Sequence, residues 1–447
     1  MSIKRTGILK LACWTLALLL AVAPLASRAS ALTVYYAKDN RIYREALARD
    51  TTLETTAFAN AATLDAAWTT AYLSGQEPDV LLLDEKSELP IWRLVQVQAF
   101  YDLTDLWQED PYYNPNDYFA NVMTAGSLDG RQYFLPFCFQ LTHAFTTQER
   151  MDLYDMKFDA RETSMQDALD LLWRHLEDMM GEQDMAALVW SITRSDAPMQ
   201  MMEFCGLPVV DYGQSEIVVD KNALFEISTM IRNVYENSAQ LERVVRKYYN
   251  NVIGVLEHVS LMIEDAPWPF NLRLYNSGYG SGLWEEPVSF VFPDWTKPGI
   301  YHAQITHYGA VSANASDPQA GYELLRALQD EDISDTVFNK GMADSVYEMS
   351  VSREVMDRTL DNLENQEGGY MMLGGKRTVV DWYEEQIETV LNSIADAVLP
   401  DRAVGAILMD CLEPYYGMQD DFDACYDELL DRLTLFLEEA PLVEAER

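Results

Sequence analysis

The stretch from Asp129 to Gln140 constrains the fold of this chain more than any other segment. It begins with an Asp129-Gly130 turn signal and continues as a run of aromatic and apolar residues that is typical of a β-strand. Pro136 interrupts the run, and because proline lacks a backbone N–H it cannot donate a hydrogen bond in the middle of a sheet. Such a strand is expected where the chain leaves one sheet and enters another. We therefore predict a hinge between two lobes, with Pro136 and Phe137 at the crossing.

A second segment of the same kind provides the return crossing. Val288–Phe292 is a short β-branched and aromatic run that is followed at once by Pro293. We predict Pro293 as a further hinge residue. Phe139 and Gln140, which follow the first crossing, are candidate contacts for a ligand held between the lobes.

Continuous apolar strands alternate with helices in the first part of the chain. Leu32–Ala37 and Pro78–Asp84 have the composition of strands, and the alanine-rich Ala61–Leu73 has that of a helix. This alternation is typical of a parallel sheet with helices on both faces. Ligands bind at the carboxyl ends of the strands in such sheets. Asp39 and Asp84 are therefore candidate ligand contacts, with helix capping or a solvated loop as the alternative.

The last third of the chain is predicted to be helical. Helices are expected over Val379–Ala397, Arg402–Leu412 and Phe422–Leu437. An earlier helix is expected over Asp220–Tyr235, with Asp220 as its N-cap.

The N-terminal 31 residues have the pattern of a signal peptide. They contain a basic stretch from Lys4 to Lys10, an apolar run from Leu11 to Leu25, and an A-x-A cleavage site at Ala29–Ala31. The chain is therefore predicted to be exported, extracellular or periplasmic, with a mature start near Leu32. Cys13 lies near the start of the apolar run, three residues after Lys10, rather than after the run, so a lipid anchor is not expected there.

The charge of the chain excludes two classes of partner. The net charge is −40, and it becomes −44 once the four basic residues of segment 1–31, which contains no acid, are removed. So acidic a surface opposes binding to nucleic acid or to an anionic membrane. The simplest role of this charge is to keep an exported protein in solution, and we expect a monomer.

Cysteine and histidine spacing predicts neither a metal nor a cofactor. Four cysteines follow the signal segment without a C-x-x-C pair, and Cys411 with Cys425 is the nearest candidate for a disulfide. His302 and His307 are the closest histidine pair, but a metal site there is not expected.

Catalytic motifs are missing from the sequence. It contains no H-E-x-x-H, no G-x-S-x-G, no P-loop and no G-x-G-x-x-G after a strand. No catalytic residue is therefore predicted, and the chain is not expected to be an enzyme. A secreted carbohydrate-active hydrolase remains the alternative.

Three tryptophans in or beside loop-like sequence are candidate ligand contacts. Trp190, Trp268 and Trp284 could stack on the apolar faces of a sugar, whose hydroxyls would need carboxylate or amide partners. The alternative is that these rings pack in the core, as buried aromatic residues commonly do.

Four motifs resemble those of the extracellular solute-binding proteins, family 1, of bacterial ABC importers. Ser74–Val80 is similar to that family's S-G-x-x-P-D-V element, and Asp129–Pro136 to its D-G-K-x-Y-x-L-P strand. Tyr308–Pro318 resembles the family's segment before a helix, and the tail from Glu413 also fits. Together these motifs span nearly the whole mature chain. Two departures are the missing lipid cysteine and Gly341–Ser345, which replaces a G-x-P-V element.

The resemblance implies a two-lobed α/β fold of the periplasmic-binding-protein type II. Each lobe would be discontinuous and built on a mostly parallel sheet flanked by helices. One would hold residues 32–137 and 290–338, and the other 138–289 and 339–447, with a third crossing between about Asp335 and Gly341. The resemblance also implies a carbohydrate ligand that is delivered to the transmembrane subunits of an ABC permease. A sensory or scaffold role with the same fold is a further alternative.

Overall fold

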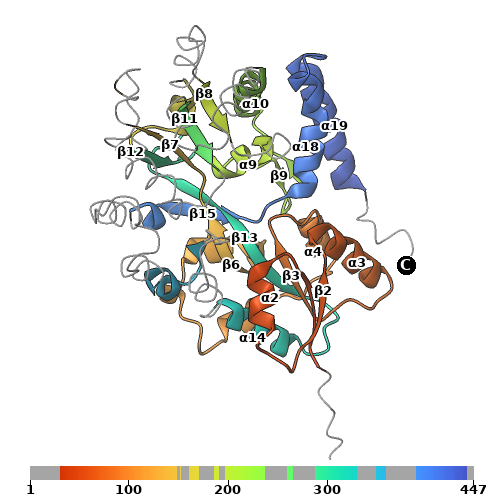
Figure 1. Cartoon of the computed structure of the whole chain (residues 1–447). Helices are drawn as coiled ribbons and strands as arrows, with labels where there is room; N and C mark the ends of the chain where they lie inside the picture. The colour runs from red at the N-terminus through yellow and green to blue at the C-terminus, as the bar shows by residue number, and fades with distance from the viewer. Residues whose placement is uncertain are drawn as a thin grey trace, which may run out of the picture.

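The chain folds into two lobes, each with its own hydrophobic core (Figure 1). This computed structural model describes residues 31–147, 152, 161–170, 186–190, 197–236, 259–264, 287–329, 349–358 and 389–439. We define lobe I as the part around the core that contains Val34, Phe134 and Tyr308, and lobe II as the part around the core that contains Met201, Leu224 and Leu408.

Lobe I is built on a sheet of seven strands in the order β14-β6-β13-β3-β1-β2, with β15 also paired to β13. The strands are β1 (Thr33–Ala37), β2 (Glu54–Phe58), β3 (Val80–Asp84), β6 (Phe134–Gln140), β13 (Tyr301–Val311), β14 (Met349–Ser350) and β15 (Ile394–Val398). β1 runs parallel to β2 and β3, and β15 runs parallel to β13. The antiparallel pairings are those of β13 with β3 and β6, and of β14 with β6.

Short helices and turns surround this sheet. They are α2 (Arg41–Leu47), α3 (Ala61–Leu73), α4 (Ile91–Gln96), α5 (Thr104–Gln108), η1 (Pro115–Asp117), α6 (Ala120–Met123), η2 (Thr124–Gly126) and α14 (Pro318–Gln329). α3 has the bounds expected from sequence, because Asn60 and Thr63 form a reciprocal capping box at its start. A two-residue turn at Asp129 and Gly130, both with positive φ, joins β4 (Ser127–Leu128) to β5 (Arg131–Gln132).

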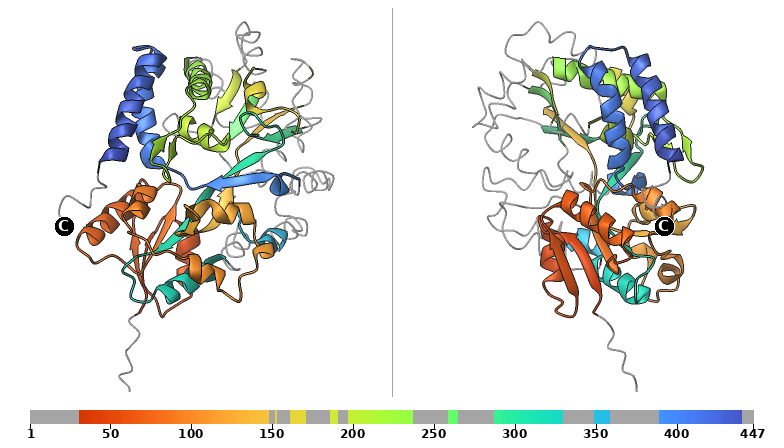
Figure 2. Two further views of the ribbon diagram at one scale, coloured as in Figure 1. Left: turned by 180° about the vertical axis from the view of Figure 1, so that it is seen from behind. Right: turned by 90° about the vertical axis from the view of Figure 1, so that its right-hand side faces the viewer.

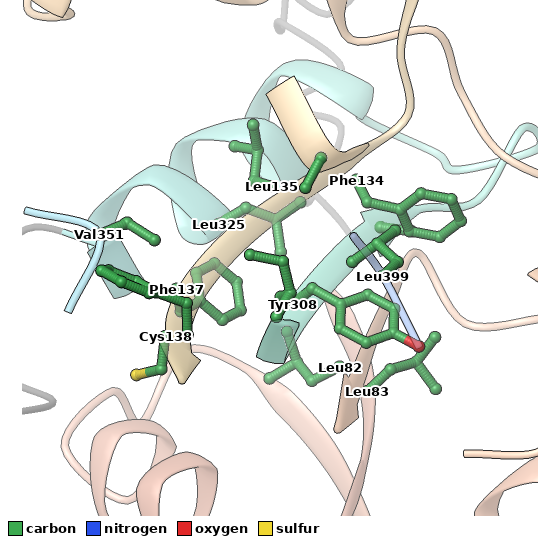
Figure 3. Close-up of a cluster of buried hydrophobic side chains, with 14 of the residues drawn as sticks. Leu82, Leu83, Phe134, Leu135, Phe137, Cys138, Tyr308, Leu325, Val351 and Leu399 are labelled. Carbon is green, nitrogen blue, oxygen red and sulfur yellow. The ribbon is translucent and has the colours of Figure 1, made fainter. Parts of the chain in front are cut away.

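β6 is the buried strand at the centre of the core of lobe I. Phe134 and Phe137 are almost completely buried; Phe137 lies on the side of Leu325 and α14, whereas the ring of Phe134 packs edge-on against Tyr308 (Figure 3). Pro136 lies inside this strand, opposite Tyr308, and the register between β6 and β13 shifts at that point. An irregular register accommodates a residue that cannot donate to the ladder. The prediction that the chain changes sheets at Pro136 is therefore wrong.

Lobe II contains a sheet of four strands in the order β12-β7-β11-β8. They are β7 (His143–Thr147), β8 (Ala186–Trp190), β11 (Val259–Glu264) and β12 (Pro287–Val291). Its helices include α9 (Ala197–Phe204), α10 (Lys221–Glu236), α18 (Arg402–Tyr416) and α19 (Phe422–Glu438), and a small hairpin pairs β9 (Val210–Asp211) with β10 (Glu216–Ile217). α18 and α19 lie side by side at one edge of the lobe (Figure 2).

The helices of lobe II follow local signals. Asp220 accepts hydrogen bonds from the N–H groups of Asn222 and Ala223, so its predicted role as an N-cap is confirmed. Asp421 caps α19 in the same way through Ala424. None of the helices in the described ranges has the length and apolar character needed to cross a bilayer.

Cys411 and Cys425, the nearest candidate pair for a disulfide, are both buried free thiols. On the paired helices α18 and α19, Arg432 lies next to Cys411, whereas Cys425 contacts the backbone of Tyr415.

The chain passes between the lobes at three described points. The first follows Gln140, where β6 of lobe I gives way to β7 of lobe II. The second lies between β12 and β13, where Pro293 bridges to Tyr301 across a tight loop. The third lies between Leu399, which packs in lobe I, and Val404, which packs in lobe II. The crossing expected between Asp335 and Gly341 falls outside the described residues.

Two segments of the last third differ from the prediction. Helix is expected over Val379–Ala397, but Ile394–Val398 forms β15. Residues from 339 onward are expected in the second lobe, whereas Met349, Val351 and Ile394 pack in the core of lobe I. The reason is that β14 and β15 complete the seven-stranded sheet, and this long-range pairing overrides the local helical composition.

Candidate functional site

The ends of β1 and β3 form a polar edge on lobe I. Asp84, the last residue of β3, is 6% exposed and accepts hydrogen bonds from Asn40 Nδ2 at 3.2 Å and from the N–H of Lys86 at 3.1 Å. Asn40 also caps α2 by accepting from the N–H of Tyr43. Asp39, next to Asn40, is exposed. The structure thus brings Asp39 and Asp84 to the same edge, with Asp84 holding the two strand ends together.

β13 extends this edge with His307, which lies opposite Asp84 in the antiparallel ladder. The ring of His307 packs edge-on against Tyr43 at 5.3 Å between centroids. The hydroxyl of Tyr43 donates to the carbonyls of Leu83 and Tyr308, which joins α2 to the sheet. No sequence motif marks His307, because its position depends on the pairing of two strands that are distant in sequence.

A buried carboxyl lies behind the polar edge. Asp65 on α3 accepts from Ser87 Oγ at 2.9 Å and from the N–H of Glu88 at 2.8 Å. Burial raises the pKa of Asp65 to about 6, against the lowering effect of these two hydrogen bonds. All three residues belong to lobe I, so this carboxyl stabilises the loop after β3.

A chain of buried polar groups connects the lobes beside this edge. Gln140 at the end of β6 donates from Nε2 to Gln304 Oε1 on β13 at 2.7 Å. Gln304 in turn donates from Nε2 to Glu203 Oε2 on α9 of lobe II at 2.5 Å. Gln304 has no exposed surface, and Gln140 and Glu203 are less than a tenth exposed. We call Gln140, Gln304 and Glu203, with Asp401 and Tyr212, the interlobe polar chain.

Asp401 and Tyr212 complete the chain on the side of lobe II. The N–H of Asp401 donates to Glu203 Oε1 at 3.1 Å, and its carboxylate caps α18 by accepting from the N–H of Val404. The hydroxyl of Tyr212 donates to the same carboxylate. Burial raises the pKa of Glu203 to about 7, even though these hydrogen bonds and the charge of Arg402 act to lower it.

Arg402 links the interlobe polar chain to the polar edge. It lies in the first turn of α18 in lobe II and donates from Nε to the carbonyl of Glu85 at 2.7 Å, directly after β3. The polar edge of lobe I therefore faces lobe II.

A histidine joins the crossing segments near the same place. His302 on β13 lies between Asp294 Oδ2, 2.9 Å from Nε2, and Asp396 Oδ1, 2.5 Å from Nδ1. Burial lowers the pKa of His302, but the hydrogen bonds and charges of Asp396 and Asp294 outweigh it, so the pKa is raised overall. The ion pairs hold the loop after β12 and strand β15 to β13.

A third contact joins α4 of lobe I to the end of α19. Arg93, 8% exposed, donates from Nη1 to the carbonyl of Leu437 at 2.8 Å and from Nη2 to that of Glu439. A cation at the C-terminus of a helix satisfies its last carbonyls and its dipole. Gln96, one turn further along α4, donates to the carbonyl of Tyr212 at 2.8 Å.

The remaining predicted site residues occupy different positions. Phe139 has no exposed surface and packs edge-on against Phe119, so its ring belongs to the core of lobe I. Trp190 is the last residue of β8, where it pairs with Ile263. Trp268 and Trp284 lie outside the described residues.

The arrangement is one of hydrogen-bonding groups rather than of a metal centre. Within the described ranges, no cluster of three or more His, Cys, Asp or Glu side chains could hold a metal ion. His302 and His307 have separate partners, Asp294 with Asp396 and Thr306 with Tyr43. What the site offers is carboxylate, amide and imidazole groups at the junction of two lobes.

Solved structures of binding proteins share this architecture. The sugar-binding protein MalE from the phytopathogen Xanthomonas citri is 12% identical, with a TM-score of 0.58, covering 91% of this chain and 97% of that one. An ABC substrate-binding protein from Listeria monocytogenes, in complex with cycloalternan, is 11% identical, with a TM-score of 0.54 and coverages of 91% and 98%. Maltose-bound MalE3 from T. maritima is 13% identical, with a TM-score of 0.54 and coverages of 91% and 99%.

The sequence matches no protein-family model and no curated protein. At these identities the likeness concerns the fold, and it confirms the fold class predicted from sequence. The chain has the two-lobed, mixed α/β fold of the periplasmic binding proteins of the MalE kind.

Proposed function

We propose that this protein is an exported, non-enzymatic solute-binding protein that holds a carbohydrate between its lobes for delivery to an ABC importer. The observation that carries this proposal is the junction itself. Two separate cores are joined by crossing segments, and the polar ends of β1 and β3 in lobe I face the first turn of α18 in lobe II. In a fold of this kind, ligands bind at the carboxyl ends of strands.

The groups at the junction suit a ligand with many hydroxyls. Carboxylates at Asp39 and Asp84 can accept hydrogen bonds from hydroxyls, and the amide of Gln140 can both donate and accept. Trp190, Trp268 and Trp284 are proposed to stack on the apolar faces of the sugar. The similar structures support this ligand class, since one is a sugar-binding protein and the others hold cycloalternan or maltose.

Binding would act by shifting an equilibrium between open and closed lobes. Ligand contacts that exist only in the closed form favour that form, and hinge closure about crossing segments is the usual motion. The closed protein would then be recognised by the transmembrane subunits of the permease. The signal-peptide pattern of residues 1–31 supports export.

A thermal-shift screen over mono- and oligosaccharides tests the ligand class. A ligand present at about 100 times its Kd adds about 2.7 kcal/mol to the free energy of unfolding, so a true ligand should raise the Tm clearly. Amino acids and short peptides serve as the control panel. A response to the control panel alone, with none to the sugars, would contradict a carbohydrate ligand. Turnover of chromogenic glycosides would favour the hydrolase instead.

Substitution of Asp39 tests the proposed site once a ligand is known. Asp39→Ala should weaken binding about tenfold, because a charged group that accepts a hydrogen bond contributes about 1.5 kcal/mol or more. Asp105→Ala, which removes an exposed acid from α5 of the same lobe, should leave the affinity unchanged. Isothermal titration calorimetry measures both. Equal affinities for the wild-type protein and Asp39→Ala would remove Asp39 from the site.

A further inference from the structure

β13 presents alternate residues to the two lobes. Tyr301, Ala303 and Ile305 pack in the core of lobe I, so the residues between them lie on the opposite face of the strand. His302 and Gln304 on that face contact Asp294 and Glu203, respectively. Gln304 is therefore a fully buried amide that joins lobe I to lobe II.

Glu203 is a buried acid without a close cation. Its Oε2 accepts from Gln304 on β13, and its Oε1 accepts from the N–H of Asp401 before α18. Within the described part of the chain, no Lys, Arg or His nitrogen lies within 4.0 Å of its carboxylate, and Arg402 acts only at longer range. An ionised carboxylate is costly to bury when it is not paired.

We propose that Glu203 is a proton-controlled contact between the lobes. When it is neutral, it holds α9 against β13 and against the start of α18. When it ionises, the cost of keeping an unpaired charge buried outweighs the two hydrogen bonds that it accepts, and the lobes separate at this point. The inference depends on the two-lobed fold and on these contacts, and does not require the ligand to be a carbohydrate.

The surroundings of Glu203 explain why ionisation would act on the junction. Among the described residues, the charges that act on Glu203 are those of Asp401 and Arg402 at the start of α18, and Tyr212 lies beyond Asp401. β6 and β13 contribute the neutral amides of Gln140 and Gln304. β13 also carries the titratable His302 two residues before Gln304, where it is paired with Asp294 and Asp396. The carboxylate of Asp401 repels a second negative charge, and the more distant Arg402 offsets this only in part. Side chains join α9 of lobe II to β13 of lobe I at this point. Water therefore reaches the ionised carboxylate of Glu203 most easily when α9 moves away from β13. Since burial raises the pKa of Glu203 to about 7, the change falls near neutral pH.

The separation of the lobes can be measured directly with spin labels. Gln76→Cys in lobe I and Gln419→Cys in lobe II provide exposed attachment sites, while Cys138, Cys205, Cys411 and Cys425 are buried. Distances between the two labels would be recorded by pulsed electron paramagnetic resonance from about pH 5 to about pH 9. The wild-type distribution should change with a midpoint near pH 7. In Glu203→Gln it should keep its low-pH form at every pH.

A second buried acid provides the matched control. Asp65 also has a raised pKa, of about 6, but its hydrogen-bond partners all lie within lobe I. Asp65→Asn should therefore leave the midpoint of the lobe separation unchanged. A wild-type distribution that does not vary with pH would overturn the proposal, as would a Glu203→Gln variant that keeps the wild-type midpoint. The labels report without any ligand, so the outcome is independent of the sugar screen.

Discussion

Gly206→Ala is expected to lower the free energy of unfolding by about 3 kcal/mol, through backbone strain and a collision at the junction of the lobes. Gly206 follows α9 with φ of +68°, a left-handed conformation that costs other residues about 1 kcal/mol. A Cβ at this position would lie 2.3 Å from His302 Nε2. His302 cannot turn aside without losing its ion pairs to Asp294 and Asp396.

Gly75→Ala separates these two effects. Gly75 ends α3 with nearly the same φ of +66°, but nothing lies within 4 Å of an added Cβ. This variant should lose only about 1 kcal/mol, the cost of the conformation alone. Urea unfolding at constant pH measures both variants. If Gly206→Ala were no less stable than Gly75→Ala, the close approach of α9 to His302 would not be significant for the junction.

Glu203→Gln is expected to gain stability relative to the wild-type protein as the pH rises, by up to about 3 kcal/mol between acidic and alkaline pH. The pKa of Glu203 is raised from 4.5 to about 7 in the folded protein, so this group binds its proton more tightly in the folded state than in the unfolded one. The stabilisation that comes from this tighter proton binding is fully present below about pH 4.5 and is lost as the pH rises through about 7. Each unit of difference in pKa corresponds to about 1.4 kcal/mol. Glutamine cannot ionise and escapes this loss, while the hydrogen bond that its NH2 group cannot accept lowers the stability by an amount that does not depend on pH.

Chemical denaturation of both proteins across this pH range provides the measurement. The difference between them should grow between about pH 4.5 and about pH 7 and then remain constant. Asp65→Asn should show its own gain in a lower window that ends near pH 6, because the pKa of Asp65 is raised from 3.8 only to about 6. A stability difference for Glu203→Gln that does not depend on pH would show that the Glu203 carboxyl titrates normally.

The elements that sequence predicted well are those with local signals. α3 has the predicted bounds because its capping box and the turn at Gly75 lie within a few residues of it. α10 and α19 have N-cap aspartates and apolar stripes that are visible in the sequence. β12 ends just before Pro293, as expected for a strand that stops at a crossing.

The elements that sequence predicted poorly depend on partners far away in the chain. β15 has helical composition and becomes a strand only because β13 pairs with it. Pro136 remains inside β6 because the register with β13 shifts there, which no local pattern reveals. For the candidate site, sequence predicted Asp39, Asp84 and Gln140, which the structure places after or at the ends of strands. It missed His307, Glu203 and Gln304, whose roles come from the pairing of β13 and from packing between lobes.

By itself, the sequence determined the class of the fold, the alternation of strands and helices, the acidic surface and the places where carboxylates follow strands. These follow from hydrophobic periodicity, turn residues and composition, which act over a few residues at a time. Only the tertiary structure decided where the chain crosses between lobes and which polar side chains meet there. Gln140, Gln304 and Glu203 are separated by up to 164 residues in sequence, and their hydrogen bonds form only once two separate cores have brought them together.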